Sequence, residues 1–322
     1  MESKNAGYSI PTQRILSILI PCLFGWACTY FTTDILRAYS YGLFIWLPFV
    51  IGATSTLIYT YKKQSPAKAA KNNAYLTLLT FCIGLLLFAW EGFICLVMAA
   101  PIGFPLTYLG YVVAKAFSKS VSANGAHTAG ILMFISVPAF MVFDDKNVVI
   151  DPIRSVTTSI EINASPEAVW KNVVAFPQLA EPTEFVFKTG IAYPINATID
   201  GQGVGAIRYC NFSTGSFVEP IKVWDEPKLL KFSVEQQPAP MKEISFYDIK
   251  PNHLHGYWIS KEGQFKLTKL ANGGTLLEGT TWYVNKNKPG FYWTIWSDFI
   301  VHQIHERVLS HIKVQAEIPT RK

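Results

Sequence analysis

Residues 289–317 read PGFYWTIWSDFIVHQIHERVLSHIKVQAE, and this stretch decides the fold of the second half of the chain. Its aliphatic residues recur at helical spacing and predict one long helix with a buried stripe: Val301, Ile304, Val308 and Ile312. At 100° per residue, Asp298, His302 and His305 share an adjoining sector. A helix with these two faces needs other elements to wrap around it.

The composition indicates a membrane protein. Of the 322 residues, 50% are hydrophobic and only 16% are charged, and the mean hydropathy is +0.23. Such a chain is too apolar for an ordinary soluble protein of this length. Residues 147–322 carry 18 Lys/Arg against 17 Asp/Glu, whereas residues 1–146 carry 10 against 5. Because phosphate binding needs a basic face, the nearly neutral second half excludes nucleic acid as a partner.

Residues 1–146 form the predicted transmembrane region, with five apolar segments: 14–31, 41–61, 74–100, 105–117 and 129–143. Pro101 and Pro105 are expected to break the helix between the third and fourth segments. Glu91 falls within the third segment. A charged group inside a span is by default a functional hypothesis, and the alternative is that it lies near the end of the span, at water or a neighbouring helix.

The charges of the loops predict the topology. The loop at residues 62–71 carries four lysines, and Lys115 and Lys119 follow the fourth segment. Under the positive-inside rule the N-terminus is cytoplasmic, and five crossings leave the second half outside. We therefore expect a multi-pass protein of a bacterial inner membrane with an extracytoplasmic domain. If residues 101–117 re-enter without crossing, the domain faces the cytoplasm instead.

From Asp151 the pattern changes to alternating strands and polar turns. A strand around Val156–Ile162 leads to a helix that Ser165 caps, with Pro166 in its first position, and a second short helix is expected at Pro177–Phe187. Six antiparallel strands then follow: Val204–Phe212, Phe217–Asp225, Leu229–Gln236, Gly256–Ser260, Gln264–Leu270 and Thr275–Asn285.

The second half resembles the START-like, polyketide cyclase and lipid-transport (SRPBCC) superfamily. The likeness covers residues 153–316 and is carried by TSIEINASPEAVW (157–170), by residues 203–234, by GGTLLEGTTWYVN (273–285) and by the terminal helix. It implies an α+β helix-grip fold for residues 147–322, in which a curved antiparallel sheet encloses a mostly apolar cavity against that helix. Members include lipid and sterol carriers, sensors and cyclases, and the superfamily has no shared catalytic triad to carry over.

The candidate ligand-binding residues lie on two predicted strands and on the terminal helix. Arg208 and Cys210 share one face of a strand, and Phe217 and Glu219 share a face of the next. With a turn at residues 213–216, Cys210 is expected opposite Glu219, and Arg208 diagonal to it. The Arg–Glu pair is either a surface pair or, on the concave face, an anchor for a ligand head group.

The terminal helix offers a second set of candidates. Asp298 is positioned to orient His302, the pairing that acid–base chemistry would use, and His305 lies one turn on. The motif HQIHE lacks the HExxH zinc pattern, so no metal site is predicted and hydrogen-bonded histidines are the alternative. Trp293 and Trp296 are expected in the core, or else at the bilayer. No phosphate-loop, dinucleotide or GxSxG motif is present, so no cofactor is expected.

The predicted function is a membrane-anchored binding module that takes up or transfers a lipid or another hydrophobic small molecule. One alternative is a cyclase- or hydrolase-type enzyme that uses the residues above. The other is a sensor that signals through the membrane helices.

Overall fold

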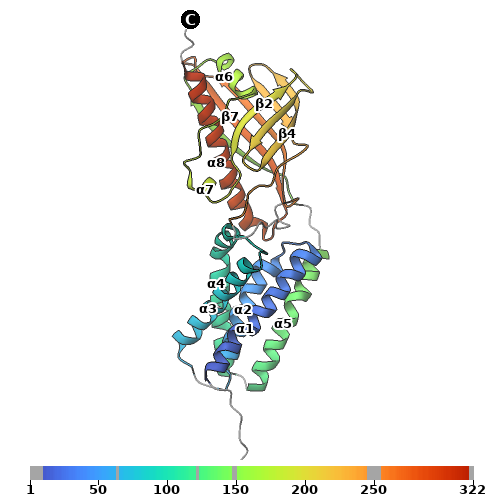
Figure 1. The fold of residues 1–322 in the computed structure, drawn as a ribbon, viewed down its shortest axis with the longest axis vertical. Coiled ribbons are helices and arrows are strands. Elements are labelled where there is room, and N and C mark those ends of the chain that lie inside the picture. Colours follow the sequence, from blue (N-terminus) through green and yellow to red (C-terminus); the bar gives the residue numbers. More distant parts are fainter. Residues whose placement is uncertain (1–9, 63–64, 121–122, 147–150, 245–254, 319–322) are drawn as a thin grey trace, which may run out of the picture. The chain divides into compact units, whose positions relative to one another are not determined.

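The computed structural model describes residues 10–62, 65–120, 123–146, 151–244 and 255–318. The chain forms two compact units (Figure 1). The first contains the helices of the N-terminal half together with residues 287–289, and the second contains the sheet and the long C-terminal helix.

The helical unit consists of α-helices, two of which are extended by π-helical segments, η1 and η2. The elements are α1 Ile10–Tyr30, η1 Phe31–Leu36, η2 Gly42–Trp46, α2 Leu47–Thr60, α3 Ala67–Leu87, α4 Phe93–Ser120 and α5 Ala123–Lys146. Four are long and apolar enough to cross a membrane: Thr12–Leu36, Gly42–Thr60, Ala67–Leu87 and Phe93–Ser118. The apolar part of α5, Thr128–Asp144, is shorter.

The break between the third and fourth helices lies at residues 88–92, so the predicted break at Pro101 is wrong. The backbone of Ala89 is left-handed, with φ 56°, and the Trp90 amide donates to the Leu85 carbonyl at 3.1 Å, which closes the end of α3. Both Pro101 and Pro105 lie inside α4. An apolar helix can tolerate proline where neighbouring groups satisfy the freed backbone. The left-handed residue at the end of α3 is Ala89 and not a glycine, so the sequence there lacks the usual signal that a helix ends.

Glu91 therefore lies between α3 and α4, outside the helix in which it was predicted. It is buried, with 7% of its surface exposed, and its Oε1 accepts a hydrogen bond from the Tyr39 hydroxyl at 3.0 Å. This agrees with the alternative in which Glu91 meets a neighbouring element at the end of a span.

Helices α2 and α4 pack closely because glycine lies at their contact. A Cβ atom at Gly52 would collide with the Thr107 carbonyl, and one at Gly110 would collide with the Phe49 carbonyl. The Thr107 hydroxyl donates to the Pro48 carbonyl at 3.1 Å across the same contact. Small residues that let backbones approach are typical of helices that associate in membranes.

The second unit is built on one seven-stranded antiparallel sheet in the order β1-β7-β6-β5-β4-β3-β2. Its strands are β1 Arg154–Ile162, β2 Pro194–Asp200, β3 Ile207–Phe212, β4 Gly215–Asp225, β5 Leu229–Ser233, β6 Trp258–Lys269 and β7 Thr275–Asn285. Helices α6 Pro166–Val174 and α7 Phe185–Lys188 connect β1 to β2, and α8 Gly290–Glu317 ends the unit. The predicted cap of α6 is confirmed, because Ser165 Oγ accepts from the Ala168 amide and Pro166 is the first helical residue.

Helix α8 runs along β1 in the same direction. Asp298 accepts from Arg154 at the start of the strand, and Glu317 accepts from the Asn163 amide just beyond its end. The nine residues of β1 and the twenty residues from Asp298 to Glu317 both span about 30 Å, so this part of α8 matches the strand in length. A curved antiparallel sheet packed around this helix is the helix-grip fold, and that prediction is confirmed (Figure 1).

The concave face of the sheet is covered by packed side chains. The Phe232 ring lies where a Cβ at Gly263 would be, and Leu309 of α8 lies over Gly279, with Leu309 only 1% exposed. Because neither glycine has a side chain, the aromatic ring and the helix can come close to the strands.

Three predicted elements of this unit are wrong in detail. Of Pro177–Phe187, only the last three residues are helical, because Pro177 and Pro182 interrupt the helix pattern. The two strands expected within 256–270 form the single strand β6, which has a register shift between Ser260 and Glu262. The strand β2 was not predicted at all.

Candidate functional site

Arg208 and Glu219 form an ion pair inside the sheet domain. They lie directly opposite each other on β3 and β4, and Arg208 Nη1 donates to Glu219 Oε2. Arg208 Nε also donates to the Val174 carbonyl at the end of α6, at 3.2 Å. The residues are 2% and 6% exposed. The pair therefore lies on the concave face, and the surface-pair alternative is wrong.

The predicted register of these strands is wrong by two residues. The turn is the two-residue loop Ser213–Thr214, closed by the pairing of Phe212 with Gly215, whereas a four-residue turn was expected. Glu219 consequently faces Arg208, and Cys210 faces Phe217. A shift of two residues keeps every side chain on its face, so the predicted set still points to one side.

Three aromatic rings surround the guanidinium group of Arg208. Its central carbon lies 5.3 Å from the ring centre of Phe232 and 5.6 Å from those of Phe176 and Phe265. At these distances the ring faces attract the cation. Removal from water raises the pKa of Glu219, and the attraction of Arg208 offsets only part of that rise. Arg208 itself stays protonated, as arginines do in proteins.

Cys210 and Phe217 belong to the packing around this pair. Burial raises the pKa of the Cys210 thiol to about 12, so the thiol stays neutral and is a poor nucleophile. The Phe217 ring packs edge-on against Phe212, with 4.9 Å between the ring centres.

The histidines of α8 connect this helix to β1 and β7. Thr158 Oγ1 lies 2.8 Å from His302 Nδ1 and 3.1 Å from His305 Nδ1. Thr281 Oγ1 lies 2.8 Å from His305 Nε2. Burial, and to a lesser degree the charge of His302, lowers the pKa of His305 to about 4. The ring of His305 is thus neutral near pH 7 and hydrogen-bonded on both nitrogens.

The predicted pairing of Asp298 with His302 is wrong. Asp298 Oδ2 accepts from Arg154 Nη2 at 2.9 Å, and Oδ1 accepts from the Tyr283 hydroxyl at 2.5 Å. The strands β1 and β7 thus supply partners for both carboxylate oxygens, and an acid–base pair within α8 is not formed.

The two predicted sets of residues do not form one site. Arg208 and Glu219 lie on β3 and β4, whereas the α8 cluster contacts β1 and β7, and the strands β5 and β6 lie between them. Each set has its own hydrogen-bond partners. Sequence periodicity identified the faces correctly but carried no information on the strand order.

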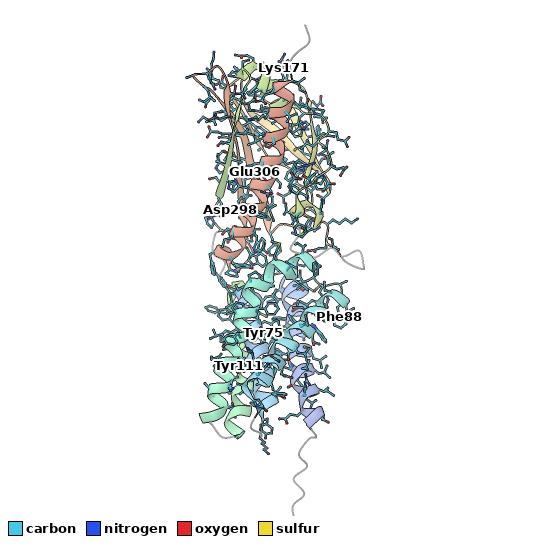
Figure 2. All side chains as sticks on the ribbon, turned by 90° about the vertical axis from the view of Figure 1, so that its left-hand side faces the viewer. Tyr75, Phe88, Tyr111, Lys171, Asp298 and Glu306 are labelled. Carbon is cyan, nitrogen blue, oxygen red and sulfur yellow. The ribbon has the colours of Figure 1, made fainter. Side chains whose placement is uncertain are left out.

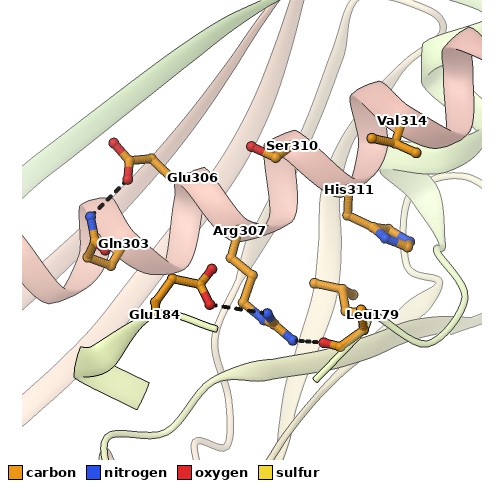
Figure 3. A pocket seen from close by; sticks show the side chains of 9 residues that line it. Leu179, Glu184, Gln303, Glu306, Arg307, Ser310, His311 and Val314 are labelled. Atoms are coloured by element: carbon orange, nitrogen blue, oxygen red, sulfur yellow. Dashed lines mark hydrogen bonds and ion pairs between the residues drawn. The ribbon is translucent and has the colours of Figure 1, made fainter. Parts of the chain in front are cut away.

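A groove of about 480 Å³ lies on the opposite side of α8, against residues 179–184 (Figure 3). Its lining combines apolar, polar and charged side chains: Leu179, Ala180, Glu184, Gln303, Glu306, Arg307, Ser310, His311 and Val314. None of these residues was predicted. The spacing of six of them on α8 fits one helical face, but that pattern is shared by any solvated face.

The floor of the groove contains a buried arginine and a buried histidine nitrogen. The side chain of Arg307 is 8% exposed, lies 3.6 Å from Glu184 and donates to the carbonyls of Ala180 and Pro194. Among the described residues, Nε2 of His311 has no hydrogen-bond partner. Burial and the charge of Arg307 lower the pKa of His311. The side chain of Ser310, which is exposed beside apolar walls, can hydrogen-bond a ligand group.

No protein-family model matches the chain, and no curated protein is similar to it in sequence. Several solved structures resemble about half of the chain. A protein of Nitrosospira multiformis is 18% identical over 52% of this chain and all of its own, with a TM-score of 0.33. Truncated norcoclaurine synthase from Thalictrum flavum is 15% identical over 54% of this chain and 99% of its own, with a TM-score of 0.35. Ara h 8.0201 is 15% identical over 51% of this chain and 98% of its own, with a TM-score of 0.32.

Proposed function

We propose that the protein is a multi-pass membrane protein whose helix-grip domain, residues 147–322, binds a lipid or another hydrophobic small molecule. The membrane part is supported by the outer faces of the helices in residues 1–146. Large apolar side chains there are strongly exposed, among them Leu23 at 60%, Leu79 at 52% and Leu132 at 61%. In water such faces would form large apolar patches, which a bilayer would cover.

The loop charges favour an extracytoplasmic domain when they are assigned to the observed helices. The lysines at 62–71 lie between α2 and α3 or in the first turns of α3, and Lys115 lies near the end of α4. The connection between α3 and α4 carries one charged residue, Glu91, and no lysine or arginine. The connection between α1 and α2 balances Arg37 with Asp34, so net positive charge alternates with its absence from one side to the other when α5, with its shorter apolar part Thr128–Asp144, is counted as a fifth crossing. The cytoplasmic orientation needs one helix that does not cross.

The groove beside α8 is the single observation that carries the binding function. Its volume of about 480 Å³ is within the range of small-molecule sites. Leu179 and Val314 supply apolar walls, and Ser310 supplies a hydrogen-bonding hydroxyl between them. Such a lining suits an amphiphilic molecule with an apolar body and a polar group. A head group at Arg208 and Glu219 stays a prediction, because the present partners of the guanidinium enclose it.

Mass spectrometry of molecules that co-purify with the full-length protein tests this function. We expect an apolar molecule with the parent protein and its loss in Ser310→Trp, because the indole fills the groove. Lys313→Trp is the matched control, since Lys313 lies on α8 outside the groove, and it should retain the molecule. If the parent carries nothing and binds nothing from a panel of lipids and sterols, or if both variants retain the molecule equally, the groove is not the binding site.

A further inference from the structure

The first turns of α8 carry an exposed apolar stripe. Phe291, Ile295 and Phe299 follow one another at intervals of four residues and therefore lie on one side of the helix. They are 70%, 66% and 46% exposed. Trp293, in contrast, is 9% exposed, in line with the buried position expected for it from the sequence.

The same side of α8 becomes polar about one third of the way along the helix. It continues with Glu306, Ser310 and Lys313, of which the first two are exposed. Figure 2 shows Glu306 on α8, farther along the helix than Asp298. A water-facing helix would be polar along its whole outer side. The change near residue 300 therefore indicates that the two parts of this side meet different surroundings.

The apolar part is the end of α8 that adjoins the helical unit in the chain. Residues 287–289 group with that unit, and Phe291 follows two residues later, a distance of at most about 7 Å along an extended chain. Lys286 and Lys288 come immediately before the helix. Aromatic and aliphatic side chains beside lysines are typical of segments that lie in the headgroup region of a bilayer.

A second connection between the units leads to the same end of the domain. Strand β1 follows α5 after residues 147–153, and Ile153, just before the strand, is 64% exposed. The ion pair of Arg154 with Asp298, at 2.9 Å, holds the start of β1 beside the third turn of α8. These two connections thus enter the domain beside Ile153 and the exposed apolar stripe of α8.

We propose that Phe291, Ile295 and Phe299, together with Ile153, form a bilayer-facing edge of the domain that inserts into the headgroup region of the membrane holding α1–α5. This inference rests on the membrane embedding in the proposed function. The domain then has a defined lipid-facing end. The groove residues Glu306 and Ser310, which follow the change in polarity near residue 300, face water.

Photolabelling of the unmodified full-length protein tests this edge. The protein is reconstituted in vesicles of phosphatidylcholine with a minor fraction of phosphatidylglycerol and a phospholipid that carries a diazirine in its acyl chain. Tryptic peptides are then sequenced by mass spectrometry. We expect adducts on Phe291, Ile295 and Phe299 in peptide 287–307, several-fold above those on Glu306 of the same peptide. The comparison is conservative, because a carboxylate traps the reactive species well.

The peptides of the helical unit distinguish the two ways in which the expectation can fail. If the exposed side chains of α3 and α4 are labelled but residues 291–299 are not, the membrane embedding holds and the lipid-facing edge is refuted. The stripe then faces water or another protein. If neither region is labelled, the embedding itself is refuted together with the edge. Labelling of residues 291–299 that is no stronger than that of Glu306 also overturns the proposal.

Discussion

Removal of Glu219 should destabilise the helix-grip domain strongly. The partner left behind, Arg208, is 2% exposed, and its guanidinium group is enclosed by aromatic rings at 5.3–5.6 Å. Water cannot replace the lost carboxylate there without disrupting that packing. Breaking a buried ion pair from one side costs about 3–5 kcal/mol of unfolding free energy. For a domain of this size the melting temperature should fall by roughly 6–20 °C.

The measurement is urea and thermal unfolding of residues 151–322, with Glu219→Ala compared with the parent. Glu262→Ala is the matched control, because it removes a carboxylate that pairs with Lys231 at 2.8 Å on the surface, where both side chains are at least 30% exposed. An exposed pair contributes at most about 1 kcal/mol. The reasoning is refuted if Glu219→Ala and Glu262→Ala unfold alike.

The double variant Arg208→Met with Glu219→Leu separates charge from packing. It removes both charges and fills the space with apolar side chains, so it should recover most of the stability that Glu219→Ala loses. If the double variant is as unstable as the single one, the loss comes from the altered packing of β3 and β4 and not from an uncompensated charge. A variant that is stable but no longer binds the co-purifying molecule would support the head-group role of Arg208.

Three other properties should respond to changes elsewhere in the molecule. Because the pKa of His305 is lowered to about 4 and an unfolded histidine titrates near 6.5, only the unfolded state gains the proton as the pH falls between these values. The domain should therefore lose up to about 3 kcal/mol over that window, and His305→Gln should unfold with a flatter pH dependence. A phosphatase reporter fused after Asp151 should be active, since it works only outside the cytoplasm; activity of a cytoplasmic reporter there would contradict the topology. Gly52→Leu should lower the melting temperature of the full-length protein in detergent, because its side chain would strike α4, whereas Gly103→Leu, which meets nothing within 4 Å, should not.

The sequence was sufficient for features that depend on local pattern. The period of Val301, Val308 and Ile312 gave the long helix and its buried side, and Ser165 with Pro166 gave the start of α6. Alternation along β3 and β4 gave the face shared by Arg208 and Cys210. These features follow from the fixed repeat of helices and strands and from capping chemistry, which neighbouring residues alone decide.

Only the tertiary structure decided how those faces combine. The length of one hairpin loop placed Glu219 opposite Arg208, and the strand order separated that pair from His302 and His305. The partners of Asp298 come from β1 and β7, more than a hundred residues away in one case and fifteen in the other. The groove at Arg307 likewise joins α8 to residues 179–184. Such contacts depend on loop geometry and chain packing over long separations, which no local period in the sequence records.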